Sequence, residues 1–198
     1  GKKTCPLVLN VYGAPAMVDV LAEMHDGGCR TVVFVGYAYG GFKNLEIGSL
    51  VVAERSYHFD GLYHAIKIDR EAAFPDKALE QKIKDVLEKE KMPYTRGINI
   101  SVPAVTFQLP HNNQTYLDIK PDTVEMELAA CFSRAHDIGM RATGILIISD
   151  NRSSGIHNDE KKKLRYEAKQ RLMGVLVQHL EELALPPLPT KKLFTIDE

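Results

Sequence analysis

The sequence predicts an α/β protein in which helices cover both faces of a central sheet. Residues 31–35 and 143–150 are apolar almost throughout and rich in β-branched side chains, as is typical of strands buried on both faces. Residues 76–91 place apolar side chains at helical spacing among charges, which indicates an amphipathic surface helix. Buried strands that alternate with such helices predict a layered α/β fold.

The first half of the chain predicts a strand, a helix and two further strands. Residues 7–12 are predicted as a strand, and the apolar-periodic helix that follows ends at Gly27-Gly28. With the strand at 31–35, this order predicts that the first two strands are parallel. Residues 36–41 are predicted as a glycine-rich turn that lets the backbone approach a ligand, and residues 47–53 as the entry to the next strand.

The second half continues the alternation. Residues 97–102 are predicted as a short strand and residues 103–121, which hold three prolines, as a long loop. Residues 125–136 are predicted as a helix, and residues 159–183 as the final helix. The strand at 143–150 ends in an acid, Asp150.

Length and charge favour a small-molecule substrate. The 198 residues suffice for one sizeable core, so we expect residues 1–198 to form a single domain. With 25 basic and 26 acidic residues the formal charge is -1, which gives no overall field to attract nucleic acid or an anionic membrane. We therefore expect neither of these as a partner.

Cysteine usage and hydropathy predict a soluble, cytoplasmic protein. Cys5, Cys29 and Cys131 are widely separated and lack the short spacing of metal or redox motifs, which suits a reducing compartment. No apolar run approaches the roughly 20 residues that span a bilayer, and the first residues lack a secretion signal. No histidine pair has metal-ligand spacing, so no metal site is expected.

Three segments resemble the nucleoside phosphorylase superfamily, in the same order as in that family. The first is residues 28–42 with the strand at 47–52, the second is Val124-Glu125-Met126-Glu127-Leu128-Ala129-Ala130, and the third is residues 144–150. The Met-Glu pair at a helix start is the most specific match. The resemblance implies a three-layer α/β/α sandwich with a mixed, partly barrel-like central sheet. It also implies a homo-oligomer that binds a nucleoside and needs no cofactor, with phosphate as a possible co-substrate.

The resemblance also implies roles for the acids. Cleavage of a glycosidic bond builds positive charge on the ribose and negative charge on the base. Glu127 would accept hydrogen bonds from ribose hydroxyls while Met126 packs on the sugar, with Glu125 in the same substrate-binding motif. Asp150 would protonate or hydrogen-bond the purine N7. Alternatively, Glu127 is a helix-capping acid, and Asp150 only caps the turn that follows it.

Other candidate residues are implied less specifically. Phe107 falls where the family places an aromatic side chain against the base, although a plain core phenylalanine is the alternative. Gly36, Tyr37 and Ala38 would line the substrate in the glycine segment.

Three histidines and a basic run remain without an assigned role. One of His58, His64 and His111 could reach the ribose 5′ position or a base edge, while a surface or internally bonded histidine is the alternative. Residues 161–163 with Arg165 form a basic run that is interpreted as a solvated helix face.

The sequence departs from the family where phosphate would bind. Family members begin with an earlier strand and a loop bearing an arginine, and this chain is expected to start about one strand–helix unit late. Phosphorolytic members carry an arginine and a serine or threonine where this chain has Phe34 and Tyr37. Tyr39 lengthens the glycine segment, so its backbone N–H groups are not expected to converge on an anion.

Three hypotheses follow. The first is an enzyme that cleaves purine nucleosides, with phosphate or water as the nucleophile; Asp150 favours a purine, and the lost arginine at Phe34 favours water. The second is a non-catalytic member that serves in nucleoside binding or storage. The third is an incomplete chain whose natural form supplies the missing loop.

Overall fold

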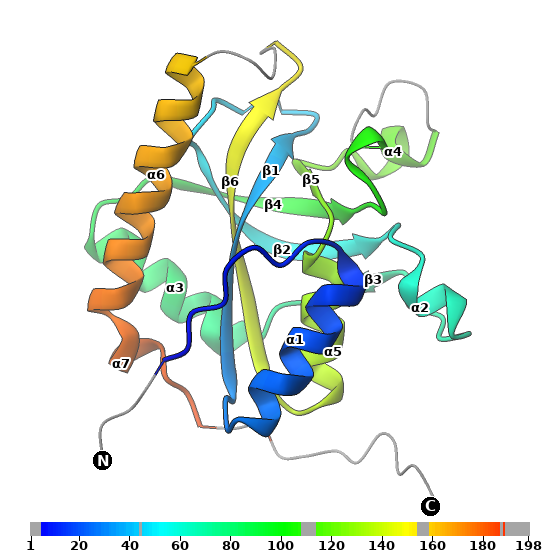
Figure 1. Cartoon of the computed structure of the whole chain (residues 1–198). Helices are drawn as coiled ribbons and strands as arrows, with labels where there is room; N and C mark the ends of the chain where they lie inside the picture. The colour runs from blue at the N-terminus through cyan, green and yellow to red at the C-terminus, as the bar shows by residue number, and fades with distance from the viewer. Residues whose placement is uncertain (1–4, 44, 108–113, 154–158, 187, 189–198) are drawn as a thin grey trace, which may run out of the picture.

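The computed structural model describes residues 5–43, 45–107, 114–153, 159–186 and 188. Its sheet has the order β3 (Ala72–Ala73), β2 (Leu50–His58), β4 (Tyr94–Ser101), β5 (Thr123–Glu125), β1 (Thr31–Gly40) and β6 (Arg141–Asn151). Strand β2 also pairs with β6, which closes the sheet into a barrel (Figure 1). Pairs β1–β6, β2–β4 and β4–β5 are parallel, whereas β1–β5, β2–β6 and β2–β3 are antiparallel. The predicted mixed, partly barrel-like sheet is confirmed.

Helices pack on both faces of this sheet (Figure 1). Helices α1 (Ala14–Asp26) and α5 (Leu128–Asp137) cover one face, and α3 (Lys77–Lys89) and α6 (Asp159–Gln178) cover the other; α7 (Leu180–Leu183) follows α6. Strand β2 illustrates why both faces are covered, because its apolar side chains alternate between them. Val51 packs toward α5, whereas Leu50 and Val52 pack toward α3 and α6. Within the described ranges, no helix is both long and apolar enough to cross a membrane.

Three short elements lie beside the barrel: α2 (Leu62–Ala65), the 3-10 helix η1 (Val105–Phe107) and α4 (Gln114–Ile119). Residues 103–121 are therefore not one irregular loop, although residues 108–113 lie outside the described part. The predicted helix at 125–136 begins at Leu128, because Thr123–Glu125 pairs with two neighbouring strands.

The prediction of a strand at residues 7–12 is wrong. These residues form no ladder, and Leu7, Leu9 and Tyr12 are largely exposed. Apolar residues alone do not make a strand where no partner strand lies alongside. The predicted pairing of the first two strands is therefore also wrong, and β1 has β6 as its parallel partner.

The predicted glycine turn at residues 36–41 is also wrong, because β1 runs on through Gly40. Gly36, Tyr37 and Ala38 pair in register with residues 146–148 of β6, and a bulge follows between Ala38 and Tyr39. Pairing along the whole of β6 overrides the local preference of glycine for turns.

Candidate functional site

Tyr39 marks the point where β5 and β6 flank β1 from opposite edges. It pairs with Val124 of β5 and with Asp150 of β6, so the three side chains share one face of the sheet. Two strand spacings put the Cα atoms of Val124 and Asp150 about 10 Å apart. The buried Tyr39 packs in a cluster with Val124 and Met126. Asp150 and the Met-Glu motif therefore lie on either side of Tyr39.

Asp150 is half-buried and held by its neighbour. Ser149 occupies the β6 bulge, and its Oγ donates to Oδ1 of Asp150 at 2.5 Å and lies 3.2 Å from the carbonyl oxygen of Ala38. Burial raises the pKa of Tyr39, and the negative charge of Asp150 raises it further. The phenol is therefore a neutral group close to this acid.

Glu125 is buried and fully occupied by protein donors. Its Oε1 accepts from Asn99 Nδ2 at 2.7 Å and Ser101 Oγ at 2.5 Å, and its Oε2 accepts the backbone N–H groups of Glu127 and Leu128, each at 2.7 Å. The last two are free donors at the start of α5, where the helix dipole favours a carboxylate. Burial, followed by the charge of Glu127, raises the Glu125 pKa to about 7. Its contacts assign Glu125 to holding α5.

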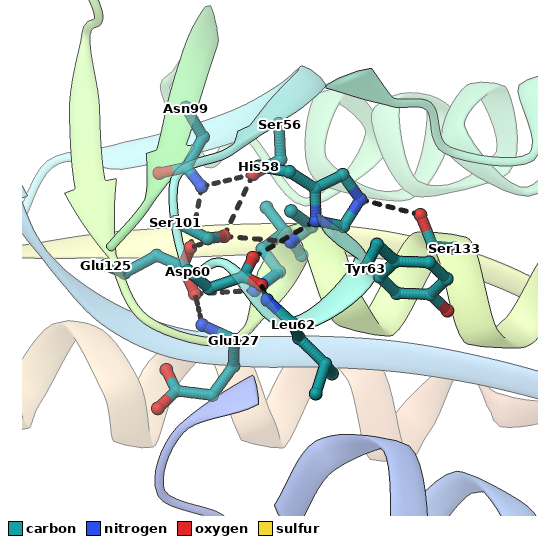
Figure 2. Close-up of polar contacts among 12 residues, drawn as sticks. Ser56, His58, Asp60, Leu62, Tyr63, Asn99, Ser101, Glu125, Glu127 and Ser133 are labelled. Atoms are coloured by element: carbon teal, nitrogen blue, oxygen red, sulfur yellow. Dashed lines mark hydrogen bonds and ion pairs between the residues drawn. The ribbon is translucent and has the colours of Figure 1, made fainter. Parts of the chain in front are cut away.

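Glu127 is the N-cap residue of α5, and its carboxylate points away from the Glu125 contacts (Figure 2). Oε1 accepts the backbone N–H of Gly13, the N-cap residue of α1, at 2.5 Å. Gly13 has a φ of 84°, which a side chain would disfavour. Burial raises the pKa of Glu127, while the Gly13 N–H acts in the opposite direction. The starts of two helices therefore meet at this acid.

Six polar residues form a buried surface beneath α5, which we call the polar docking patch. They occupy two rows of strand partners on β2, β4 and β5: Ser56, Asn99 and Thr123 in the first row, and His58, Ser101 and Glu125 in the second. Hydrogen bonds link the first row, from Thr123 Oγ1 to Asn99 Oδ1 at 2.9 Å and from Asn99 Nδ2 to Ser56 Oγ at 2.7 Å. Ser56 Oγ joins this row to the second, since it lies 3.1 Å from Ser101 Oγ. The patch binds α5 directly, since Ser101 Oγ accepts the N–H of Ala129 at 2.9 Å.

Sequence reasoning did not predict this patch, although it named two of its members, Glu125 and His58, as candidate site residues. Its signal is the alternation Ser56-Tyr57-His58, Asn99-Ile100-Ser101 and Thr123-Val124-Glu125. Such alternation ordinarily indicates a strand with one solvated face. Here helix α5 covers the polar face. The sequence of each strand alone does not reveal this cover, because it depends on which elements pack together in the fold.

His58 is one of the three histidines that the sequence left without an assigned role. Its Nε2 lies 2.8 Å from Ser133 Oγ on α5, and its Nδ1 lies 3.1 Å from Oδ2 of Asp60 (Figure 2). The side chains of His58 and Asp60 are 4% and 1% exposed. His64 is exposed on α2, and His111 lies outside the described residues.

Other predicted site residues do not join this group. Phe107 is 60% exposed at the end of η1, and its carbonyl accepts from Tyr116 Oη at 3.2 Å. Tyr37 lies under Arg165 and Lys169 of α6, 5.6 and 5.4 Å from its ring centre. Part of the predicted basic run therefore packs on β1.

Two further features lie apart from the predicted residues. A cavity of about 360 Å³ opens beside α6 and the start of β2, between residues that include Gly48, Met92 and Arg171, and it contains none of the predicted site residues. Among the residues that the structure describes, no three His, Cys, Asp or Glu side chains are grouped to hold a metal ion.

Comparison with known proteins gives a family and a fold. The sequence pattern described as the phosphorylase superfamily matches residues 12–181. No curated protein matches the chain. Among solved structures, 5′-methylthioadenosine/S-adenosyl homocysteine nucleosidase of Campylobacter jejuni superposes with a TM-score of 0.72 and 17% identity, covering 86% of this chain and 78% of that one.

Two further structures share the fold. A mutant of futalosine hydrolase from Helicobacter pylori gives a TM-score of 0.66 at 20% identity, over 85% of this chain and 77% of that one. The P. knowlesi homologue of P. falciparum PNP gives a TM-score of 0.61 at 15% identity, over 81% of this chain and 68% of that one.

Proposed function

Since the chain belongs to the phosphorylase superfamily, we propose that it hydrolyses the N-glycosidic bond of purine nucleosides. The observation that carries this proposal is the position of the two acids that the family resemblance singles out. Asp150 and the Met126-Glu127 pair flank β1 at Tyr39, where one small molecule could contact both sides. The structures of nucleosidases and of a futalosine hydrolase that share the fold support hydrolysis of a nucleoside.

Each acid has a separate task in the proposed reaction. Glu127 binds the ribose hydroxyls while Met126 packs on the sugar, so that the ribose is held where positive charge develops. Water attacks the anomeric carbon as the bond to the base breaks, the bonding electrons leave with the base, and the attacking water releases a proton to solvent. Asp150 delivers or shares a proton at N7 of the purine, which stabilises the departing base. Glu125 acts indirectly by holding the start of α5.

Water is proposed as the nucleophile because the strand lacks an anion site at the expected place. Phe34 packs in the apolar core under α1 and α5. Tyr37 points to the other face, beneath α6, and residues 36–38 are engaged with β6 as a strand. This stretch of β1 therefore offers phosphate no cation at Phe34 and no turn of free N–H groups.

A second candidate is a nucleoside-binding protein without catalytic activity. Two observations favour it: the buried ring of Tyr39 lies between Asp150 and Met126, and the Glu127 carboxylate already accepts the N–H of Gly13. In this case the protein would bind a purine nucleoside and leave the glycosidic bond intact.

The two candidate functions are distinguished by measuring the free base released from purine nucleosides by the wild type and by variants in which one acid at a time is replaced. We expect Asp150→Asn and Glu127→Gln each to lower kcat/KM at least about 100-fold, as for loss of a general acid or a group that acts in the transition state. Asp85→Asn is the matched control, because Asp85 is an exposed acid on α3. Nucleoside binding without release would support the second candidate. Release that neither substitution slows would refute the proposed roles.

A further inference from the structure

Helix α5 carries three attachment points at a spacing of four residues. The N–H of Ala129 binds Ser101, the hydroxyl of Ser133 faces His58, and the carboxylate of Asp137 binds Arg70 in two places, at 2.5 and 3.1 Å. Residues four apart lie on one face of a helix, so a single polar stripe meets the strand ends. This stripe sets how far α5 lies along the sheet and how it is rotated.

His58 is the central group of this attachment, and its neighbours fix its orientation. Asp60 Oδ1 accepts the N–H of Leu62 at 2.8 Å, which leaves Oδ2 to accept from Nδ1 of His58. In the tautomer that carries its proton on Nδ1, the ring donates to Asp60 and its Nε2 accepts from the Ser133 hydroxyl. The ring also lies 5.0 Å from that of Tyr63, centre to centre.

This order of groups matches that of a serine, histidine and aspartate triad, but Ser133 cannot serve as its nucleophile. Ser133 is 3% exposed and lies inside α5, where a substrate carbonyl has no approach. Backbone N–H groups within a helix are already bonded to carbonyls four residues earlier, so they cannot form an oxyanion hole. The hydrogen bonds of His58 to Ser133 and Asp60 are therefore structural and not part of a catalytic triad.

What they hold is the helix whose N-cap residue is Glu127. Ser133 is six residues further on, about 9 Å along the helix axis. The Glu125 carboxylate fixes the first N–H groups of α5, yet attachment at one end leaves a helix free to pivot. The apolar contacts of α5 with α1 are non-directional and do not prevent this. Directional contacts further along the helix, at Ser133 and then at Asp137, remove that freedom.

We propose that His58 is a positioning residue for nucleoside cleavage: backed by Asp60, it holds α5 through Ser133 and so fixes the Glu127 carboxylate against the ribose. This inference rests on the proposed function. It assigns His58 an effect on recognition of the sugar and none on recognition of the base, because Asp150 lies on β6, where Ser149 holds its carboxylate.

The test compares His58→Ala and Ser133→Ala with His179→Ala. His179 is a matched control because its two ring nitrogens also meet acids, Glu90 and Glu182, each at 2.9 Å, far from α5 on the α6–α7 side. For each variant we would measure the melting temperature, kcat/KM for adenosine and the inhibition constant of adenine, the free base.

We expect both α5-contact variants to lower kcat/KM for adenosine about tenfold, the effect of losing one good hydrogen bond, while adenine inhibition changes less than about twofold. The control variant should lose thermal stability alone. If kcat/KM for adenosine and inhibition by adenine weaken equally, or if neither changes, the positioning role is overturned. Base release by the wild type would still uphold the proposed function in that case. Wild-type protein that neither binds nor cleaves adenosine would overturn both. If His58→Ala does not fold, Ser133→Ala, which removes one hydroxyl, gives the same comparison.

Discussion

The carboxylate of Glu127 accepts the backbone N–H of Gly13 at 2.5 Å, which joins the start of α5 to the start of α1. Because Gly13 has a φ of 84°, this donor depends on a backbone conformation that only glycine adopts readily. The two helix starts and the acid therefore form one unit.

Replacing Gly13 should disturb both stability and catalysis. We expect Gly13→Ala to lower the free energy of unfolding by about 2 kcal/mol, because alanine is strained in this conformation, and to lower kcat/KM for base release as Glu127 loses its donor. Gly28→Ala is the control, since Gly28 also has a positive φ, 93°, but follows the other end of α1. Denaturant unfolding and initial rates measure the two effects. Equal activity in the two variants would contradict the link between Gly13 and Glu127.

Glu125 should make stability depend on pH in a particular direction. Burial raises its pKa from the ordinary 4.5 to about 7, so the folded state holds its proton more tightly than the unfolded state. The stabilisation that protonated Glu125 gives the folded state is therefore full below pH 4.5 and is lost as pH rises towards 7. Unfolding free energies of wild type minus those of Glu125→Gln should fall across this interval. A difference that stays flat or rises with pH would refute the assignment.

Tyr39 should matter through both its ring and its hydroxyl. Tyr39→Ala leaves a cavity between β5 and β6 and should cost about 3–5 kcal/mol of stability, whereas Tyr39→Phe keeps the ring and should cost less than about 1 kcal/mol. Because the phenol lies close to Asp150, we expect Tyr39→Phe to slow base release severalfold. Tyr57→Phe, a change in the same cluster, should not slow it. If Tyr57→Phe slows release as much, the effect does not depend on Asp150.

Cys131 reports on the packing of α5. It lies on this helix and is 1% exposed, and burial raises the pKa of its thiol, so the reactive thiolate is scarce. In a Cys5→Ser variant, which removes the exposed thiol, we expect Cys131 to remain unlabelled by a maleimide under native conditions. Ser133→Ala in that background should speed labelling measured by mass spectrometry. Rapid labelling of Cys131 without this change would contradict a tightly held α5.

Much of the fold is predictable from local patterns. The helical period of residues 76–91 and the apolar runs at 31–35 and 143–150 indicate α3, β1 and β6, because burial on one stripe or on both faces leaves a mark in the sequence. The extent of β1 and the coil at residues 7–12 are not predictable in this way. Both depend on whether a partner strand lies alongside, which no local pattern reports.

The candidate site follows the same division. Met126 and Glu127 in one segment and Asp150 in another could be named because each segment is compact and resembles a family motif. The partners of His58 could not be named, since Asp60 is nearby in the sequence but Ser133 is 75 residues away. Glu125 carries the same motif signal as Glu127, and only the four donors around it show that it holds α5.

The most direct test of the account is to incubate the folded wild-type protein with purine and pyrimidine nucleosides, with and without phosphate, and to measure free base. We predict release from purine nucleosides at the same rate whether or not phosphate is present, with free ribose as the other product. Release that requires phosphate would contradict water as the nucleophile, and no release from any purine nucleoside would contradict the proposed enzyme.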